Sequence, residues 1–102
     1  MSNLFSIVEI TIKPQQRGAY LDPLRELLRK GATSGAFLSQ KIHINPRKPS
    51  TVVVTLRWTS EEAMRAFQNS DLIHDFLNET AGCLAGPSIY KTFTIESEQT
   101  LL

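Results

Sequence analysis

The stretch Thr51–Phe67, TVVVTLRWTSEEAMRAF, predicts a strand that runs directly into a helix, and the fold can be built outward from it. Its first half is rich in β-branched residues, including the run Val52–Val54, and branching at Cβ suits a pleated surface. We expect the strand to end at Trp58, the only tryptophan. Thr59 and Glu62 then match a capping box, in which a hydroxyl accepts a free backbone N–H and a carboxylate lies three residues on. This stretch therefore predicts a strand, a corner and an amphipathic helix, in that order.

The length and composition are those of one globular domain. With 102 residues, 41% of them hydrophobic and 21% charged, the chain has enough apolar content for its own core. We expect a single domain over 1–102, with the core at about 4–95 and a tail at 96–102. The net charge of +1 gives no electrostatic reason to expect nucleic acid as a partner.

The same composition gives no sign of a membrane segment or of export. No apolar run approaches the roughly 20 residues that a membrane-spanning helix needs, and the N-terminus does not resemble a signal peptide. The single cysteine, Cys83, has no partner for an internal disulfide and suits a reducing compartment. We therefore expect a cytoplasmic protein that does not bind membranes.

A strand and a helix are predicted at the N-terminus. Residues 4–12 alternate between apolar and mixed positions, as a strand with one buried face does. A helix follows, with leucines at helical spacing, and two starting points are open. Asp22 caps it with Pro23 in the first turn, or it begins near Gln15 and is kinked at Pro23. Gly35 is the expected C-terminal stop.

A hairpin leads into the corner. Residues 37–44 predict a second strand, with Leu38, Ile42 and Ile44 on its core side. The whole run Asn45–Ser50, NPRKPS, has turn composition and joins this strand to the next.

The second helix is predicted in two segments. The first places Phe67 inward, and an interruption at Gln68–Asp71 follows, where Ser70 is a suitable cap for the second segment. The last strand spans 88–95. The expected buried stripe of the second segment consists of Leu72, Ile73, Phe76 and Leu77.

These elements give the order β-α-β-β-α-β, a ferredoxin-like α+β fold with an antiparallel sheet. One sheet face is apolar and is expected to hold both helices. The other is mixed, and a second copy covering it would explain the mixture, so we expect a homodimer; a threonine-rich face left in water is the alternative. We assign to the mixed face Phe5, Ile7, Val53, Thr55, Tyr90 and Thr92, among Glu9, Lys41, His43 and Arg57.

The element order and several motifs resemble the antibiotic biosynthesis monooxygenase family. Lys13-Pro14 follows the first strand and Gly35 precedes the second, as in that family. The corner Trp58–Ala63, WTSEEA, followed by Phe67 and Ser70, is similar to the family's most recognisable stretch. The similarity covers nearly the whole chain.

The resemblance implies a dimeric α/β barrel, in which two ferredoxin-like sheets face each other. It also implies a monooxygenase, because members of known activity oxidise aromatic polyketides or quinols with O₂ and use no metal or flavin. We therefore expect no cofactor and a small aromatic, polyketide or quinol ligand. The substrate's own electrons reduce O₂, and the protein supplies a pocket that excludes water and groups that accept or donate protons.

The sequence departs from the family pattern in places that bear on the reaction. Leu56 stands where a glutamate often lies, two residues before the corner tryptophan. The branch that degrades haem uses an asparagine, a tryptophan and a histidine, and the last two of these positions are Phe67 and Leu77 here. Because that triad is absent, haem degradation is disfavoured.

His74 and Tyr90 are the candidate catalytic residues. His74 is the histidine expected nearest the pocket mouth, and an imidazole pKa of about 6.5 suits a proton acceptor for a phenol or quinol. Its alternative is an ordinary exposed helix histidine. Tyr90 either meets a second subunit or donates to a bound oxygen.

The candidate substrate-binding residues are Trp58, Phe67, Asn69 and Phe76. For Trp58 the alternative is a packing anchor at the corner, with its indole N–H bonded inside the core. For Asn69 the alternative is a capping role at the helix break. These alternatives leave open a second function, a non-catalytic homodimeric module that binds a small apolar ligand.

Other chemistries find little support. Two histidines and one cysteine give no metal-ligand spacing, and the chain has no glycine-rich phosphate loop and no nucleophile elbow. RNA-binding modules of this fold order carry stacking aromatics on the third strand. The run TVVVTLR has none there.

Overall fold

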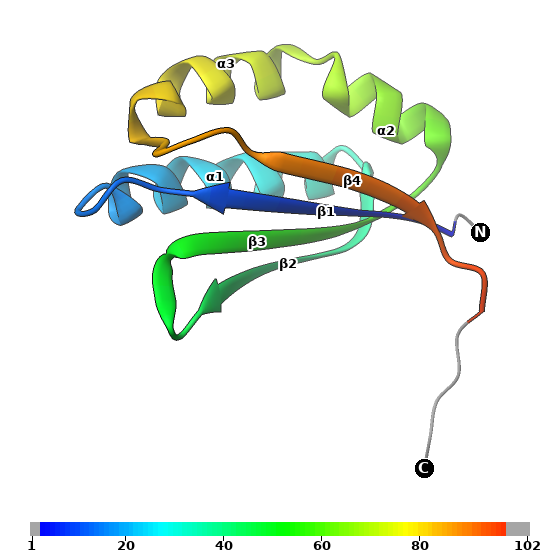
Figure 1. Ribbon diagram of the computed structural model, residues 1–102. Helices are drawn as coiled ribbons and strands as arrows, with labels where there is room; N and C mark the ends of the chain where they lie inside the picture. Colours follow the sequence, from blue (N-terminus) through cyan, green and yellow to red (C-terminus); the bar gives the residue numbers. More distant parts are fainter. Residues whose placement is uncertain (1–2, 98–102) are drawn as a thin grey trace.

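The computed structural model describes residues 3–97 as a four-stranded antiparallel sheet with its helices on one face (Figure 1). The strand order is β2-β3-β1-β4, so the predicted ferredoxin-like α+β fold is confirmed. Of the predicted tail, 98–102 lies outside the described residues. The elements are β1 (Leu4–Thr11), α1 (Arg17–Thr33), β2 (Phe37–Asn45), β3 (Lys48–Trp58), α2 (Glu61–Gln68), α3 (Asp71–Thr80), the 3₁₀ turn η1 (Ala81–Cys83) and β4 (Ile89–Thr94).

Helix α1 starts near the earlier of its two predicted positions. It begins at Arg17 and contains Pro23, so the prediction that Asp22 caps it is wrong. Asp22 instead pairs with Arg25 on the exposed surface. The proline loses one helical hydrogen bond, but the helix buries a continuous leucine stripe against the sheet, which outweighs that loss. Gly35 ends the helix as predicted, with φ of +83°, a conformation that favours glycine.

Strand β2 differs from the prediction because of a bulge at its start. Phe37 pairs with Trp58, but Ser39 pairs with Arg57, so Leu38 is an extra residue between the two pairs. The shift by one residue exchanges the faces. Phe37 is therefore buried in the core, and Leu38 is 50% exposed, which corrects its predicted core position.

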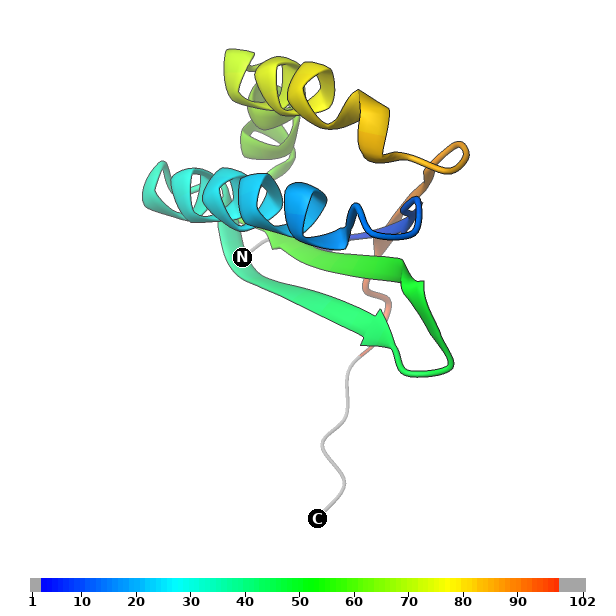
Figure 2. The ribbon, with the colours of Figure 1, turned by 90° about the vertical axis from the view of Figure 1, so that its left-hand side faces the viewer.

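The hairpin turn is shorter than its composition suggests. Only Pro46 and Arg47 separate the two strands, and Lys48, Pro49 and Ser50 already belong to β3. Both strands extend beyond the rest of the sheet here, and their tip stands apart from the helices in Figure 2.

The cap of α2 is Ser60, not Thr59. The Ser60 hydroxyl accepts the backbone N–H of Ala63, so the third helical position holds no carboxylate and the predicted capping box is absent. Thr59 donates to the Gly35 carbonyl oxygen and ties the corner to the end of α1. At the next helix, Ser70 caps α3 as predicted.

The buried stripe of α3 is also shifted. Phe76 is buried as predicted, but Leu77 is 53% exposed, which corrects its assignment to the stripe. Thr80 is buried instead, because its hydroxyl donates to the Phe76 carbonyl oxygen and needs no water.

The two faces of strand β4 are exchanged relative to the prediction. Tyr90 pairs opposite Val8 and Thr92 opposite Ser6, and both partners lie on the helix side of β1. Tyr90 and Thr92 were assigned to the open face, and that assignment is wrong. Ile89, Lys91 and Phe93 occupy the open face in their place.

The core lies between the sheet and the helices. Within the described residues, no helix is long and apolar enough to cross a membrane. The buried apolar side chains are Ile10, Ile12, Tyr20, Leu21, Leu24, Leu27, Leu28, Ala36, Phe37, Val52, Val54, Leu56, Trp58, Phe67, Phe76 and Cys83.

Candidate functional site

A cavity of about 260 Å³ lies between the helix side of the sheet and the helices, and its walls are mainly apolar. Strands β1, β3 and β4 form one wall, and α1, α2 and α3 form the other. Its lining residues are Val8, Ile10, Tyr20, Leu24, Leu27, Leu28, Val54, Leu56, Trp58, Phe67, Gln68, Ile73, Phe76, Leu77, Ser88 and Tyr90.

An aromatic cluster closes one end of this cavity. The ring centroids of Trp58 and Phe67 are 5.7 Å apart, and Phe37 lies 5.0 Å from each of them. Such tilted contacts add to the free energy gained by burial alone. The corner tryptophan is 1% exposed, so Trp58 is a packing anchor and a cavity wall at the same time.

A chain of hydrogen bonds runs along the sheet wall. The Trp58 Nε1–H donates to the Ser6 Oγ at 2.8 Å, and Ser6 is completely buried. The Ser6 Oγ also lies 2.9 Å from the Thr92 Oγ1 and 3.2 Å from the Tyr90 Oη. The buried indole N–H is thereby satisfied, and its acceptor is linked to β4.

Tyr90 connects this chain to the helices at the exposed side of the cavity. The Gln68 Nε2 donates to the Tyr90 Oη at 2.5 Å, which joins the end of α2 to β4. Tyr90 is 46% exposed, and Leu77, across the cavity on α3, is exposed as well. The opening of the cavity is therefore on the side where α3 faces β4.

Tyr20 is the other phenol on the cavity wall. It is buried, and its ring meets Phe76 edge-on with centroids 5.5 Å apart. Burial, and to a smaller extent the nearby Cys83 thiol, raises the pKa of Tyr20 to about 12. The phenol therefore stays protonated at neutral pH and can act as a hydrogen-bond donor but not as a base.

The described part of the cavity wall carries no aspartate, glutamate, lysine, arginine or histidine. His74, a predicted catalytic residue, lies on the exposed side of α3 and does not line the cavity. Asn69 also lies outside it and donates from its side chain to the Arg65 carbonyl oxygen at the end of α2. The structure thus places four of the six predicted site residues together: Trp58, Phe67, Phe76 and Tyr90.

The sequence prediction missed Ser6, Gln68 and Tyr20 as polar groups of the site. Ser6 had a visible signal, because it is the one polar residue among the apolar positions on the helix side of β1. Gln68 had none, since a glutamine at a helix end is common and only the fold brings it to Tyr90.

A second hollow of about 330 Å³ lies on the outside, between α1 and α3. Asp22, Glu26, Asp75 and Glu79 line it, and within residues 3–97 no cluster of side chains is arranged to hold a metal ion. Its charged walls make it unsuited to an apolar ligand, and the inner cavity is the better candidate site.

The fold and cavity agree with a family comparison. The family model for antibiotic biosynthesis monooxygenase matches residues 4–79, about three quarters of the chain, including β1, the Trp58 corner and most of α3. The chain belongs to the antibiotic biosynthesis monooxygenase family. A comparison with curated proteins finds no significant match.

Solved structures share the fold of this family member at low sequence identity. A crystal structure of an antibiotic biosynthesis monooxygenase has a TM-score of 0.83 and 16% identity, covering 92% of this chain and 99% of the other. A protein of unknown function from Nitrosomonas europaea has a TM-score of 0.80 and 20% identity, covering 100% of this chain and 97% of the other. A protein from Pseudomonas aeruginosa has a TM-score of 0.83 and 18% identity, covering 95% of this chain and 97% of the other. These likenesses show a shared fold.

Proposed function

We propose that this family member is a monooxygenase that oxidises a small aromatic or quinol substrate with O₂ inside the inner cavity. The observation that supports it most is the position of Tyr90: a phenol at the opening of an apolar cavity, bonded to both sheet and helix. The apolar walls exclude water from an electron-rich substrate, which protects reactive intermediates. Membership in the antibiotic biosynthesis monooxygenase family supports this reaction class.

The reaction balances without a resident cofactor. One oxygen atom of O₂ enters the substrate and the other leaves as water, while the substrate supplies all the electrons and its own hydrogens. The protein then has to bind the ring, orient its oxygen and supply hydrogen bonds to oxygen as negative charge develops. The Tyr90 Oη and the Gln68 amide are polar groups of the cavity wall that could do this.

Oxygen uptake with a panel of hydroquinones and polyphenols tests the proposal. We expect turnover above the buffer rate and a fall of about tenfold or more in Tyr90→Phe, since one oriented donor to developing charge is worth at least that. Gln40→Leu, at an exposed position on β2 outside the inner cavity, is the control and should keep the rate. A panel with no turnover above buffer would contradict the proposal.

His74 needs its own test, because it was predicted to accept a proton but lies outside the cavity wall. If it accepts the proton released by the substrate, His74→Ala lowers the rate, because the proton loses its acceptor. An unchanged rate in His74→Ala would end its assignment as a catalytic residue.

A second function is favoured by one feature, the lack of any side chain on the described wall with an ordinary pKa near neutrality. Such a wall suits a module that binds a small apolar ligand and does not react with it. Ligands that raise the melting temperature while no oxygen is consumed would favour this function over the first.

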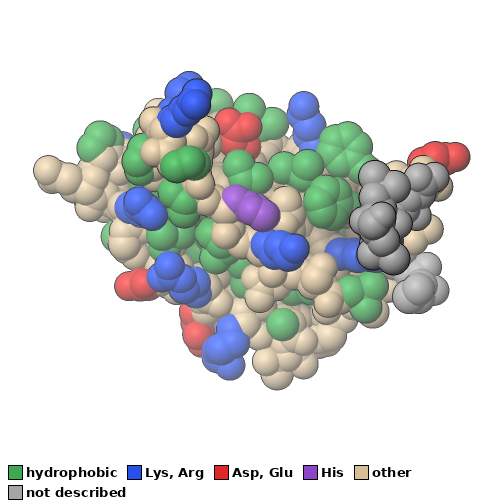
Figure 3. Space-filling view, turned by 90° about the horizontal axis from the view of Figure 1, so that it is seen from below, with side chains coloured by type: hydrophobic (Ala, Val, Ile, Leu, Met, Phe, Trp, Pro, Cys, Tyr) green, Lys and Arg blue, Asp and Glu red, His purple; other side chains and the backbone are tan. Residues whose placement is uncertain are grey.

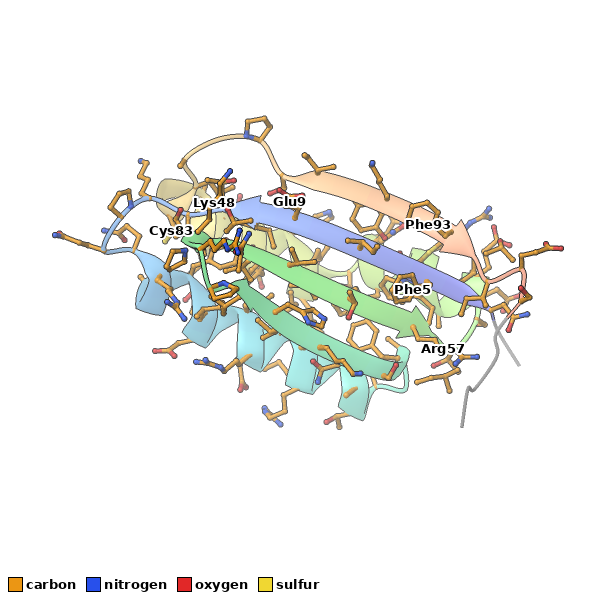
Figure 4. The ribbon with its side chains drawn as sticks, turned by 60° about the horizontal axis from the view of Figure 1, so that its bottom comes forward. Phe5, Glu9, Lys48, Arg57, Cys83 and Phe93 are labelled. Atoms are coloured by element: carbon orange, nitrogen blue, oxygen red, sulfur yellow. The ribbon has the colours of Figure 1, made fainter. Side chains whose placement is uncertain are left out.

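We also propose that the chain acts as a homodimer through the open face of the sheet. Side chains on this face remain accessible, and Ile89 and Phe93 are 51% and 47% exposed. Figure 3 shows hydrophobic side chains gathered there among lysines and arginines. In Figure 4, Phe5, Arg57 and Phe93 lie on neighbouring strands at one end of this face and Glu9 at the other. A second copy of the sheet would remove this apolar area from water.

A further inference from the structure

We infer that self-association regulates the inner cavity: a second copy on the open face fixes strand β4, and β4 carries Tyr90 on the cavity wall. The cavity is then complete only in the homodimer. The inference deepens the proposed function, because it names the regulation of the same site, and it rests on both the site and the homodimer proposed above. A monomer keeps the aromatic end of the cavity but has Tyr90 in place for only part of the time.

Strand β4 has little support within a single chain. It is an edge strand that pairs with β1 alone, and all six of its residues, Ile89–Thr94, are exposed. Within the described chain, the buried apolar core includes no residue of β4. Segments with few buried apolar contacts are the ones that open locally at the lowest cost in free energy. We therefore expect β4 to separate from β1 more readily than the central strands separate from each other.

The open side of β4 is where a second copy gains most. Ile89 and Phe93 point to this side and are 51% and 47% exposed. On the neighbouring strand β1, Phe5 and Ile7 are already half-buried, and Figure 4 shows Phe5 beside Phe93. A second sheet therefore removes more apolar area from water by covering β4 than by covering β1. In the homodimer, β4 gains the buried contacts that it lacks in one chain.

The two sides of β4 connect the open face to the cavity, because side chains alternate along a strand. On the cavity side, the Tyr90 Oη lies 2.5 Å from the Gln68 Nε2 and 3.2 Å from the Ser6 Oγ. The Thr92 Oγ1 lies 2.9 Å from the same Ser6 Oγ, which also accepts the Trp58 indole N–H. These bonds depend on the position of β4, because a hydrogen bond weakens steeply with distance and misalignment.

Dimerisation and the ordering of β4 are then linked equilibria. A second copy that contacts ordered β4 and makes no contact with displaced β4 shifts the population towards the ordered strand. The coupling between two such events is usually about 5-fold to 150-fold. The same linkage makes the proposed oxidation faster per chain as the protein concentration, and with it the dimer fraction, rises.

Dilution of the unaltered protein tests the inference without any substitution. Sedimentation gives the dimer fraction at each concentration, and hydrogen exchange read by mass spectrometry gives the opening of 89–94. We expect this segment to exchange about fivefold or more faster in the monomer, and the central strand β3 to change by less than about twofold. The emission of Trp58, the only tryptophan, should shift to longer wavelength along the same dilution curve, because water then reaches the Ser6 hydroxyl that accepts its indole N–H.

A variant outside β4 separates the effect of the dimer from direct damage to the strand. Thr55, on the open face of β3, lies in one row across the sheet with Lys41 and Lys91. Thr55→Lys adds a third ammonium to this row, so two copies repel each other. At a concentration where the unaltered protein is dimeric, we expect this variant to be monomeric and to show fast exchange of 89–94. Thr33→Lys, the same change at an exposed position on α1, is the matched control and should remain dimeric with slow exchange.

The inference is overturned if the dimer forms but 89–94 exchanges equally fast in the dimer and in the monomer, whether the monomer is obtained by dilution or by Thr55→Lys. A protein that is monomeric at every concentration also overturns it. Failure of the proposed function looks different. In that case dimerisation slows the exchange of 89–94 as expected, but no hydroquinone or polyphenol causes oxygen uptake at any protein concentration.

Discussion

At the scale of single residues, the aromatic end of the cavity depends on a glycine. A Cβ built on Gly31 of α1 would lie 2.5 and 2.9 Å from ring atoms of Phe37 and 2.8 Å from one of Phe67. Those rings are packed against Trp58 and cannot swing aside freely. Close approach of the helix, not backbone conformation, therefore requires glycine at this position.

This contact predicts opposite results for two glycines of the same helix. Gly31→Ala gains about 1 kcal/mol of helix propensity but overpacks the rings at a cost of about 1 to 3 kcal/mol. We expect a net fall in the free energy of unfolding, measured with urea. Gly18→Ala, where no atom lies within 4 Å of the added Cβ, is the matched control and should leave stability equal or higher. A Gly31→Ala protein more stable than the original would contradict the packing.

Tyr20 makes stability depend on alkaline pH. Its pKa of about 12 in the folded protein is above its ordinary value of 10.0. Above pH 10 the unfolded chain loses this proton while the folded protein retains it, so the free energy of unfolding falls as pH rises towards 12. The loss attributable to Tyr20 is about 2 to 3 kcal/mol.

Urea unfolding at pH 8 to 12 checks this effect. Other groups also titrate over the range, so the comparison is with Tyr20→Phe, which keeps the ring but not the proton. The original protein should lose more stability than the variant between pH 10 and pH 12. Parallel curves for the two proteins would show that the Tyr20 phenol is not desolvated.

At the scale of elements, the positions of the helices were largely predictable from the sequence. Which side chains of a strand face the core was less predictable. Periodicity located both segments of the second helix and the Ser70 cap between them, because capping and helical spacing are local properties. The face of a strand is not local. One bulge moved Leu38 out of the core, and the pairing with β1 turned Tyr90 towards the helices.

The cap of α2 provides a test at this scale. Ser60→Ala removes the acceptor of the Ala63 backbone N–H and should lower the free energy of unfolding by about 1 kcal/mol. Because α2 carries Phe67 and Gln68, ligand affinity should fall as well. Ser50→Ala, at an exposed position near the hairpin, should change stability by less than about 0.5 kcal/mol. Equal effects of the two substitutions would contradict Ser60 as the cap.

At the scale of the whole molecule, the proposed homodimer predicts which surface controls association. Sedimentation equilibrium at micromolar concentration should give twice the chain mass of 11.5 kDa. Phe93→Glu places a charge in the proposed interface and should shift the protein towards monomer. Leu77→Glu, an equally exposed leucine on the helix side, should stay dimeric. If the unaltered protein sediments as a monomer, the proposed dimeric α/β barrel is wrong.

The sequence by itself determined the element order, the fold class and the family, because these depend on periodicity, turn residues and a short motif at Trp58 that are all local in the chain. It also identified Trp58, Phe67 and Phe76 as large apolar groups that end up around one cavity. Tertiary structure decided which polar groups join them. Ser6, Gln68 and Tyr90 come from three separate elements, and only the strand register and the approach of α2 to β4 bring their oxygen and nitrogen atoms within hydrogen-bonding distance.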